Sequence, residues 1–391
     1  MTEHPFAEVI DRSVTERAGD VIGLSHDLHA RPELAFEEHD AARWCGQRLS
    51  DLGLDVDAGI AGLPTAFRAT IGSGPLTVGI CAEYDALPGI GHACGHNIIA
   101  AAAVGAAAAL APICDDLGIT LVVIGTPAEE RGGGKVLLLD AGAFDDLDLA
   151  MMVHPAPADI ERAASLAVRN LAVHYTGKAS HASAAPQAGI NAADAQVVAQ
   201  VAIGLLRQHL RRSDQVHGIV TDGGEAPNVV PSSTTACYCV RSPRIDRLEP
   251  LRQRVEACFE AGATATGCEV EIHPDPAYAE LLHDSDIGAC YRAAGESIGR
   301  SFLDPPGEGL PVVVGSTDMG NVSHLVPTIH PMIAIDSRGA MNHQAAFAEA
   351  AASASGDQAV IDGARLLART VASVSSSDTL TSRLHAQRDA R

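Results

Sequence analysis

Residues 91–97 read Gly-His-Ala-Cys-Gly-His-Asn, which places a cysteine and two histidines beside two glycines. Thiolate and imidazole are ligands that a borderline-soft divalent cation such as Zn²⁺ accepts. Gly95 separates Cys94 from His96 and lets the backbone turn so that the two side chains converge. The stretch therefore suggests a metal site. A buried cysteine beside a capping histidine would explain it equally well.

Further candidate ligands follow apolar runs. Glu129 and Glu130 come after the run 119–125 and before three consecutive glycines. Neighbouring side chains on an extended segment point apart, so Glu130 can bind a cation while Glu129 faces a reacting water. The alternative is a solvated acidic loop. His154 and His343 are each unremarkable alone, because a single histidine is more often structural, and they gain weight only as members of this set.

The elements that must position these residues alternate along the chain. Four runs have the apolar character of strands, and helical patterns lie between them. This alternation predicts a mixed, mainly parallel sheet covered by helices, with ligands bound where strands end. The predicted strands are 65–71, 76–83, 119–125 and 147–155.

The pattern changes near residue 165. A strand, a helix, two strands, a helix and a strand follow in turn, which is the order of a small ferredoxin-like domain. We therefore predict a catalytic domain split into 1–164 and 277–391, with an inserted domain over 165–276. A further buried strand is expected around 330–335, and the serine-rich tail from about 374 is expected to fray.

Composition excludes several partners. The chain has 391 residues, is 47% hydrophobic and carries a net charge of −22, so neither nucleic acid nor an anionic membrane surface is expected to bind it. The first residues lack a secretory pattern, and the apolar run 100–111 is too short to span a bilayer. Nine scattered cysteines fit reduced thiols, so we expect a cytoplasmic protein.

Several motifs together resemble one family. The chain looks like the aminoacylase/carboxypeptidase family of metal-dependent amidohydrolases, in the branch of p-aminobenzoyl-glutamate hydrolase, hippurate hydrolase and the indole-acetyl-amino-acid hydrolases. The resemblance runs in consistent order from about residue 20 to 370. Its motifs are HARPELAFEE (29–38), AEYDALPGIGHACGHN (82–97), GTPAEE (125–130), NVVP (228–231) and MNH (341–343).

The resemblance implies two divalent metal ions, Zn or Mn, that share one ligand and a bridging water. By position, Glu129 would be the general base, Asp85 would orient a ligand, and the ligands would be Cys94, His96, Glu130, His154 and His343. The inserted domain would form a homodimer and close over the site. Its His181 would stabilise the oxyanion in the partner subunit's site, while Asn228 and Arg241 would hold the substrate's free carboxylate. Two positions depart from many relatives: Asn97 and Glu83 both replace a frequent aspartate.

The expected activity is hydrolysis of the amide of an N-acyl amino acid or dipeptide-like small molecule with a free carboxylate, such as p-aminobenzoyl-glutamate. Bound metals would polarise the carbonyl and lower the pKa of water, and Glu129 would move the proton to the leaving nitrogen. Two alternatives stay open. One is an aminohydrolase that releases ammonia, and the other is a non-catalytic, metal-stabilised binding dimer.

Overall fold

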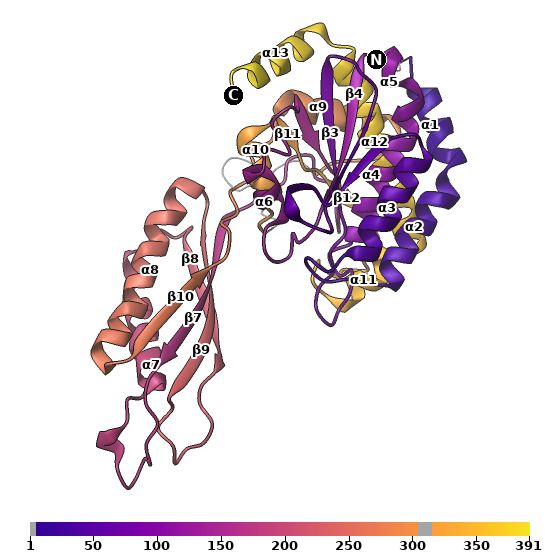
Figure 1. Cartoon of the computed structure of the whole chain (residues 1–391). Coiled ribbons are helices and arrows are strands. Elements are labelled where there is room, and N and C mark those ends of the chain that lie inside the picture. The colour runs from indigo at the N-terminus through magenta and orange to yellow at the C-terminus, as the bar shows by residue number, and fades with distance from the viewer. Residues whose placement is uncertain (1–4, 304–314) are drawn as a thin grey trace. The chain divides into compact units, whose positions relative to one another are not determined.

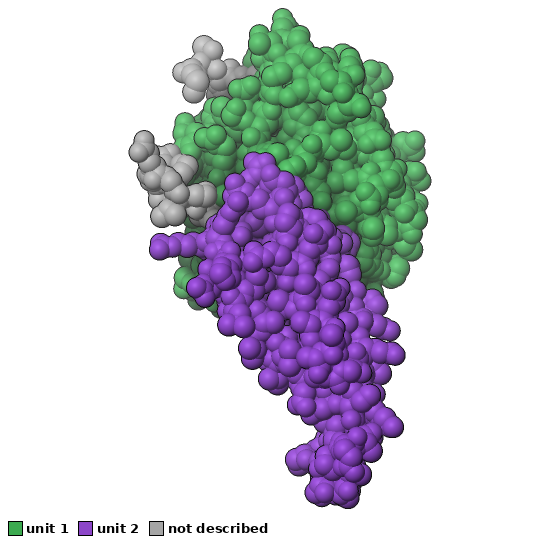
Figure 2. Space-filling model, turned by 90° about the vertical axis from the view of Figure 1, so that its left-hand side faces the viewer, with its two compact units in different colours: residues 1–164, 281–391 green, residues 165–280 purple. Residues whose placement is uncertain are grey.

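The computed structural model describes residues 5–303 and 315–391, which form two compact units. Unit 1 comprises residues 1–164 and 281–391, and unit 2 comprises residues 165–280 (Figure 2). The sequence pattern placed the return to the first unit at 277, four residues before the division in the structure. Every predicted metal ligand belongs to unit 1.

A six-stranded sheet forms the centre of unit 1, in the order β1-β2-β4-β3-β5-β11. The strands β4, β3, β5 and β11 are parallel, whereas β1 and β2 add an antiparallel edge. The predicted mixed, mainly parallel sheet is thus confirmed. The strands are β1 (Asp55–Ala58), β2 (Phe67–Ile71), β3 (Leu76–Glu83), β4 (Ile119–Thr126), β5 (Leu149–Met151) and β11 (Thr328–Ile329).

Helices surround this sheet (Figure 1). They are α1 (Ala7–Glu16), α2 (Ala18–Ala30), α3 (His39–Asp51), α4 (His96–Leu110), α5 (Cys114–Leu117), α6 (Gly134–Asp140), α9 (Ser285–Ser297), α10 (Met319–Leu325), α11 (Ala345–Ala351), α12 (Ala354–Ser375) and α13 (Asp378–Asp389). Short 3₁₀ turns lie at Ile60–Gly62 and Ala111–Ile113.

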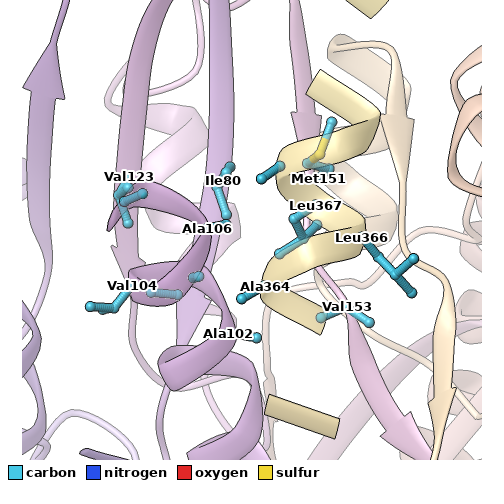
Figure 3. Close-up of a cluster of buried hydrophobic side chains, with 14 of the residues drawn as sticks. Ile80, Ala102, Val104, Ala106, Val123, Met151, Val153, Ala364, Leu366 and Leu367 are labelled. Carbon is cyan, nitrogen blue, oxygen red and sulfur yellow. The ribbon is translucent and has the colours of Figure 1, made fainter. Parts of the chain in front are cut away.

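Alternate strand residues face two different apolar clusters, so both faces of the sheet are covered. Ile80 and Val123 pack with α4 and α12, whereas Cys81 and Val122 belong to a cluster with residues of α6 and α10. Figure 3 shows the first cluster, in which Ala364 of α12 lies beside the small residues of α4. The alanine run in α4 permits this close approach.

The apolar stretch His96–Leu117 is long and hydrophobic enough to cross a membrane, judged by composition only. In the structure, 89% of its 18-residue apolar portion is buried inside the protein. The stretch is therefore buried as a core segment of the protein is.

Unit 2 has the predicted strand and helix order. Its four-stranded antiparallel sheet runs β10-β7-β9-β8, and alternate residues of β7 and β9 pack on α7 and α8. The elements are β7 (Ala167–Thr176), η3 (Pro186–Ala188), α7 (Ala192–Leu206), η4 (Arg207–His209), β8 (Gln215–Asp222), β9 (Ser233–Ser242), α8 (Ile245–Thr266) and β10 (Glu269–Pro274).

Two sequence-based expectations were wrong in detail, and a third, the buried strand around 330–335, was confirmed at a shorter length. The predicted strand 147–155 is divided into β5 and β6 (His154–Ala156), and 330–335 holds only the short strand β12 (Met332–Ala334). β6 and β12 pair with each other in a separate two-stranded parallel sheet. The tail does not fray, because α13 buries Leu380 and Leu384 and its Arg383 pairs with Asp284 at 2.8 Å.

Candidate metal centre

The turn before α4 explains the glycine between Cys94 and His96. Gly95 has φ +77°, a left-handed conformation that disfavours a side chain, and it caps α4. A Cβ atom at this position would lie 2.4 Å from Cγ of Pro155. The backbone therefore needs glycine here for both its conformation and its close contact with the segment that carries His154.

All five predicted ligands converge in unit 1. Cys94, His96 and His154 offer ligand atoms within 4.8 Å of one another, and Cys94, Glu130 and His343 form a second such group. Cys94 belongs to both groups, as a ligand shared by two ions would. The predicted clustering of these side chains is therefore what the structure displays, while their roles as ligands stay a prediction.

Asp85 links two of the predicted ligands. Its Oδ1 accepts a hydrogen bond from Nδ1 of His96 at 3.1 Å, and its Oδ2 accepts one from the backbone N–H of Glu130 at 2.9 Å. Burial opposes ionisation of Asp85, yet the bond to His96 holds its pKa below the usual range. A carboxylate at Nδ1 leaves the Nε2 lone pair of His96 for a cation, as the resemblance implied for Asp85.

His154 is prepared in a similar way. Its Nδ1 lies 2.9 Å from the carbonyl oxygen of Pro155, which fixes the proton there and directs Nε2 toward Sγ of Cys94. Burial, reinforced by nearby His96, lowers the pKa of His154 to about 4. The ring is therefore neutral near pH 7, which is the state that binds metal.

Glu130 and His343 complete the second group. Nε2 of His343 lies 3.4 Å from Oε2 of Glu130, and the backbone N–H of His343 donates to the carbonyl of Ala93 at 2.8 Å. His343 has φ +68°, an uncommon conformation outside glycine. Burial alone would raise the pKa of Glu130, but His343 and His96 hold it below its ordinary value.

The distances between pairs of candidate ligand atoms show whether one cation fits between them. Two ligands on a tetrahedral Zn²⁺ lie about 3.5 Å apart for a sulfur–nitrogen pair and about 3.4 Å for a nitrogen–oxygen pair. The Cys94 Sγ–His154 Nε2 distance is 3.5 Å, and the Glu130 Oε2–His343 Nε2 distance is 3.4 Å.

Buried polar atoms without hydrogen-bond partners also indicate a metal site. His96 Nε2 and Glu130 Oε1 are buried and have no hydrogen-bond partner among the described residues. Burial, then the charge of Glu130, raises the pKa of the Cys94 thiol, so a cation is what would make it a thiolate. The residues fit divalent metal ions.

Glu129 lies beside this cluster with only 8% of its surface exposed. Burial, followed by the charges of Glu83, Glu130 and Asp318, raises its pKa well above the ordinary value. Ala128, which precedes it, has φ +61°, and its N–H donates to Oε1 of Glu38 at 2.8 Å. A carboxyl group whose pKa is raised in this way holds an accepted proton more firmly than an exposed carboxylate does, which suits a general base.

A buried ion cluster that no sequence pattern predicted lies next to the site. Nζ of Lys135 contacts Oε2 of Glu83 and lies 2.8 Å from Oδ1 of Asp318, and all three residues are fully buried. We call these residues the lysine cluster. The sequence signal was weak: Glu83 stood out only as a departure from relatives, and Lys135 only as the residue after a glycine run.

The other three predicted site residues all belong to unit 2. Nδ1 of His181 accepts hydrogen bonds from the N–H groups of Ser183 and Ala184, so in the neutral ring Nε2 carries the proton. His181 does not cap the helix that follows, because Asn191 caps α7. The backbone carbonyl of Asn228 accepts from Ala182 at 2.9 Å, which places Asn228 near His181.

Arg241 lies at the other end of β9 from this pair, opposite Val168 and Gln215. Eight strand steps separate Ser233 from Arg241, which is roughly 26 Å of extended chain. One protomer therefore does not bring Arg241 and Asn228 to a single carboxylate.

Comparison with known proteins places these observations in a family. The model of peptidase family M20/M25/M40 matches residues 79–373. The mouse Xaa-Arg dipeptidase is 40% identical over 386 residues, which cover 94% of this chain and 88% of that protein. A subunit of the p-aminobenzoyl-glutamate hydrolase of Escherichia coli is 31% identical over 292 residues, covering 69% of this chain and 61% of that protein.

Solved structures share the fold. The aminobenzoyl-glutamate utilization protein of Klebsiella pneumoniae superposes with a TM-score of 0.74 at 19% identity, over 93% of this chain and 98% of that one. A Bacillus subtilis protein described as a dinuclear metal binding peptidase from the M20 family gives 0.69 at 20% identity, over 92% and 99%. With the family match and the clustered ligand set, the chain belongs to peptidase family M20/M25/M40 and is a metal-dependent amidohydrolase or peptidase.

Proposed function

We propose that this protein hydrolyses a dipeptide or N-acyl amino acid with a free carboxylate, using two divalent ions, Zn or Mn, held by Cys94, His96, Glu130, His154 and His343. The observation that carries the proposal is the meeting of these five side chains around one shared thiol, with the buried carboxyl of Glu129 beside them. Family membership supplies the reaction class, and the chain's own residues supply the site.

The metals, when bound, would polarise the amide carbonyl and acidify a water molecule. The remaining chemistry belongs to the protein. Glu129 accepts the proton of the attacking water and then delivers it to the leaving nitrogen, a task that suits a carboxyl whose pKa burial raises. Asp85 keeps the His96 ring oriented, and Nε2–H of His181 is available to donate to the oxyanion.

Two relatives guide the choice of substrate. The dipeptidase relative shares 40% identity over nearly the whole chain, so dipeptides ending in arginine are the first class to test. Aminobenzoyl-glutamate, the substrate named by the 31% relative, is the second. Both have a free carboxylate, which suits the bidentate guanidinium of Arg241 together with the amide of Asn228.

A homodimer is part of the proposal. Because Arg241 and Asn228 lie at opposite ends of β9, a single carboxylate can meet both only if two protomers contribute. The surface of unit 2 supports such pairing: Val197, Val201 and Leu205 form a stripe on α7, each more than half exposed. Strand β8 lies at the sheet edge, where another strand can add.

The decisive experiment is a substrate panel with the metal-reconstituted protein. We expect amino-acid release from Xaa-Arg dipeptides or from aminobenzoyl-glutamate, and we expect Glu129→Gln to lower kcat by about a hundredfold or more with little change in metal content. Release of ammonia without an amino acid would instead favour the aminohydrolase. If no substrate of the panel were hydrolysed and Glu129→Gln left every other measured property unchanged, the metal-stabilised binding dimer would be the better account.

A further inference from the structure

The lysine cluster leaves one carboxylate oxygen unexplained. Oε2 of Glu83 contacts Nζ of Lys135, but Oε1 is buried and has no hydrogen-bond partner among the described residues. Lys135 balances the charge of this carboxylate, but a buried oxygen without a hydrogen bond is still costly, so Oε1 calls for a cation or a donor. Oε1 of Glu83 lies 3.1 Å from Nε2 of His96, and this nitrogen likewise has no hydrogen-bond partner in the described part of the chain.

The arrangement of His96 narrows the possibilities. Its Nδ1 proton is directed to Asp85, so in the neutral ring Nε2 presents a lone pair. Two lone pairs 3.1 Å apart repel each other unless something positive lies between them. Either the ring carries a second proton that Glu83 accepts, or both atoms bind the same cation.

The distance between Glu83 Oε1 and His96 Nε2, and the residues around these atoms, favour the second possibility, a shared cation. Nitrogen and oxygen ligands of one ion, at metal distances of about 2.0–2.2 Å and angles near 90–110°, lie roughly 2.9–3.5 Å apart. The observed 3.1 Å falls inside this range. Glu83, His96 and Glu129 also offer ligand atoms within 4.8 Å of one another, and His96 belongs to the group of Cys94 and His154 as well.

We propose that Glu83 is a further metal ligand, which binds through Oε1 the same ion as His96 and is held in place by Lys135. The inference rests on the proposed metal-dependent function and adds a carboxylate to the five ligands predicted from sequence. Lys135 fits the holding role because it is fully buried and anchored on its other side by Asp318. Oδ1 of Asp318 lies 2.8 Å from Nζ of Lys135, and its Oδ2 accepts the backbone N–H of Lys135 at 2.9 Å.

This geometry supplies a matched pair of variants. Glu83→Gln and Asp318→Asn each remove one negative charge from the same buried lysine, so both should disturb the fold to a similar degree. In the proposal only Glu83 touches the ion. The full-length chain is stripped of metal, and binding of Mn²⁺, Zn²⁺ and Co²⁺ is measured by calorimetry, with the visible d–d spectrum of Co²⁺ as a record of its ligands.

We expect wild type to bind two ions and Glu83→Gln to bind one of them about tenfold or more weakly, with an altered Co²⁺ spectrum. Asp318→Asn keeps an oxygen that can accept from Nζ of Lys135, so it should lower ion affinity clearly less than Glu83→Gln does and should keep the wild-type spectrum. Equal affinities and spectra for wild type and Glu83→Gln would overturn the inference while leaving the metal-dependent function intact. Wild type that binds no ion would overturn both.

Folding is checked separately by thermal unfolding of each metal-free variant. If Glu83→Gln does not fold, Glu83→Asp keeps the charge for Lys135 but shortens the side chain by one methylene. We expect that variant to fold and to show the same weakened ion and changed spectrum. Ion binding like that of wild type in Glu83→Asp, with an unchanged spectrum, would count against ligation by Glu83.

Discussion

Asp85 shows how much of the site depends on a single side chain. Its two carboxylate oxygens each accept one hydrogen bond, from His96 Nδ1 and from the backbone N–H of Glu130, so it aligns one ligand of each predicted metal group. Exchange for asparagine keeps the size of the side chain but replaces one acceptor by an NH₂ group. One of the two buried donors then loses its partner, at a cost of about 1–3 kcal/mol.

We therefore expect Asp85→Asn to lower metal affinity and kcat/KM by about 10–100-fold while the protein remains folded. Calorimetric metal titration and steady-state kinetics check this. Asp20→Asn, on the exposed surface of α2, serves as the control and should behave as wild type. Unchanged metal affinity in Asp85→Asn would show that the orientation of His96 does not depend on this carboxylate.

Glu38 predicts a pH dependence of stability. It is fully buried, and burial, reinforced by the charge of Asp85, raises its pKa from 4.5 to about 7. The folded protein therefore binds a proton that the unfolded chain releases between these values. The stabilising contribution is complete below pH 4.5 and is lost as pH rises to about 7, by roughly 3 kcal/mol in total.

Glu38→Gln removes this titration but keeps an oxygen that can accept the N–H of Ala128. Relative to wild type, the variant should become more stable as pH rises from about 5 to 8. Urea unfolding across this range measures the difference. Glu37→Gln, at an exposed neighbouring position, is the control, and its difference in unfolding free energy from wild type should not change with pH. If the difference for Glu38→Gln also did not change with pH, Glu38 would not be protonated in the folded protein.

At the scale of elements, the turn into α4 can be tested through two glycines that share a left-handed backbone. Gly95 has φ +77° and no room for a Cβ, whereas Gly118 has φ +63° and open space around it. Gly118→Ala should cost only the conformational strain, about 1–2 kcal/mol. Gly95→Ala should cost about 1–3 kcal/mol more, because its methyl group would push against Pro155.

Only Gly95→Ala should also weaken metal binding, since it displaces Cys94 and His96 relative to the segment that carries His154. Chemical denaturation and metal titration of both variants give the comparison. Equal stability losses with equal metal affinities would show that the turn and the site are independent of each other.

Elements were also where the sequence was most informative. Apolar runs of strand length and a change of pattern near residue 165 were enough to predict both sheets and the ferredoxin-like order. The division of 147–155 was not predictable, because apolar residues run through it while its pairing partner changes from β3 and β11 to β12. The tail was misjudged since its order depends on distant partners, such as Asp284 for Arg383.

At the site, motifs predicted the residues that converge but not their supports. The five ligands and Asp85 lie within recognisable local patterns, so their types and order were sufficient. Lys135 contacts Glu83 from 52 positions away and Asp318 from 183, and a lysine after glycines reads as a surface residue. Only the folded chain places that lysine in the core, where burial and pairing give it a role.

At the scale of the whole molecule, a complementation experiment distinguishes a dimer with shared sites from independent subunits. We propose that Glu129 acts in the subunit that holds the metals and that His181 reaches this site from the partner subunit, as the family resemblance implies. A mixed dimer of His181→Ala and Glu129→Gln would then contain one site with both groups intact. Each variant alone should be nearly inactive, because every site lacks one of the two groups.

After subunit exchange of an equimolar mixture, about half of the dimers are mixed and each has one complete site, so activity should recover to about a quarter of the wild-type level. A mixture of His181→Ala with the double variant should stay inactive, because no dimer in it has an intact pair. Size-exclusion chromatography with light scattering establishes the dimer beforehand. If the first mixture also stays inactive although exchange is verified with labelled subunits, His181 acts within its own chain, and the dimer would have to serve the carboxylate rather than the oxyanion.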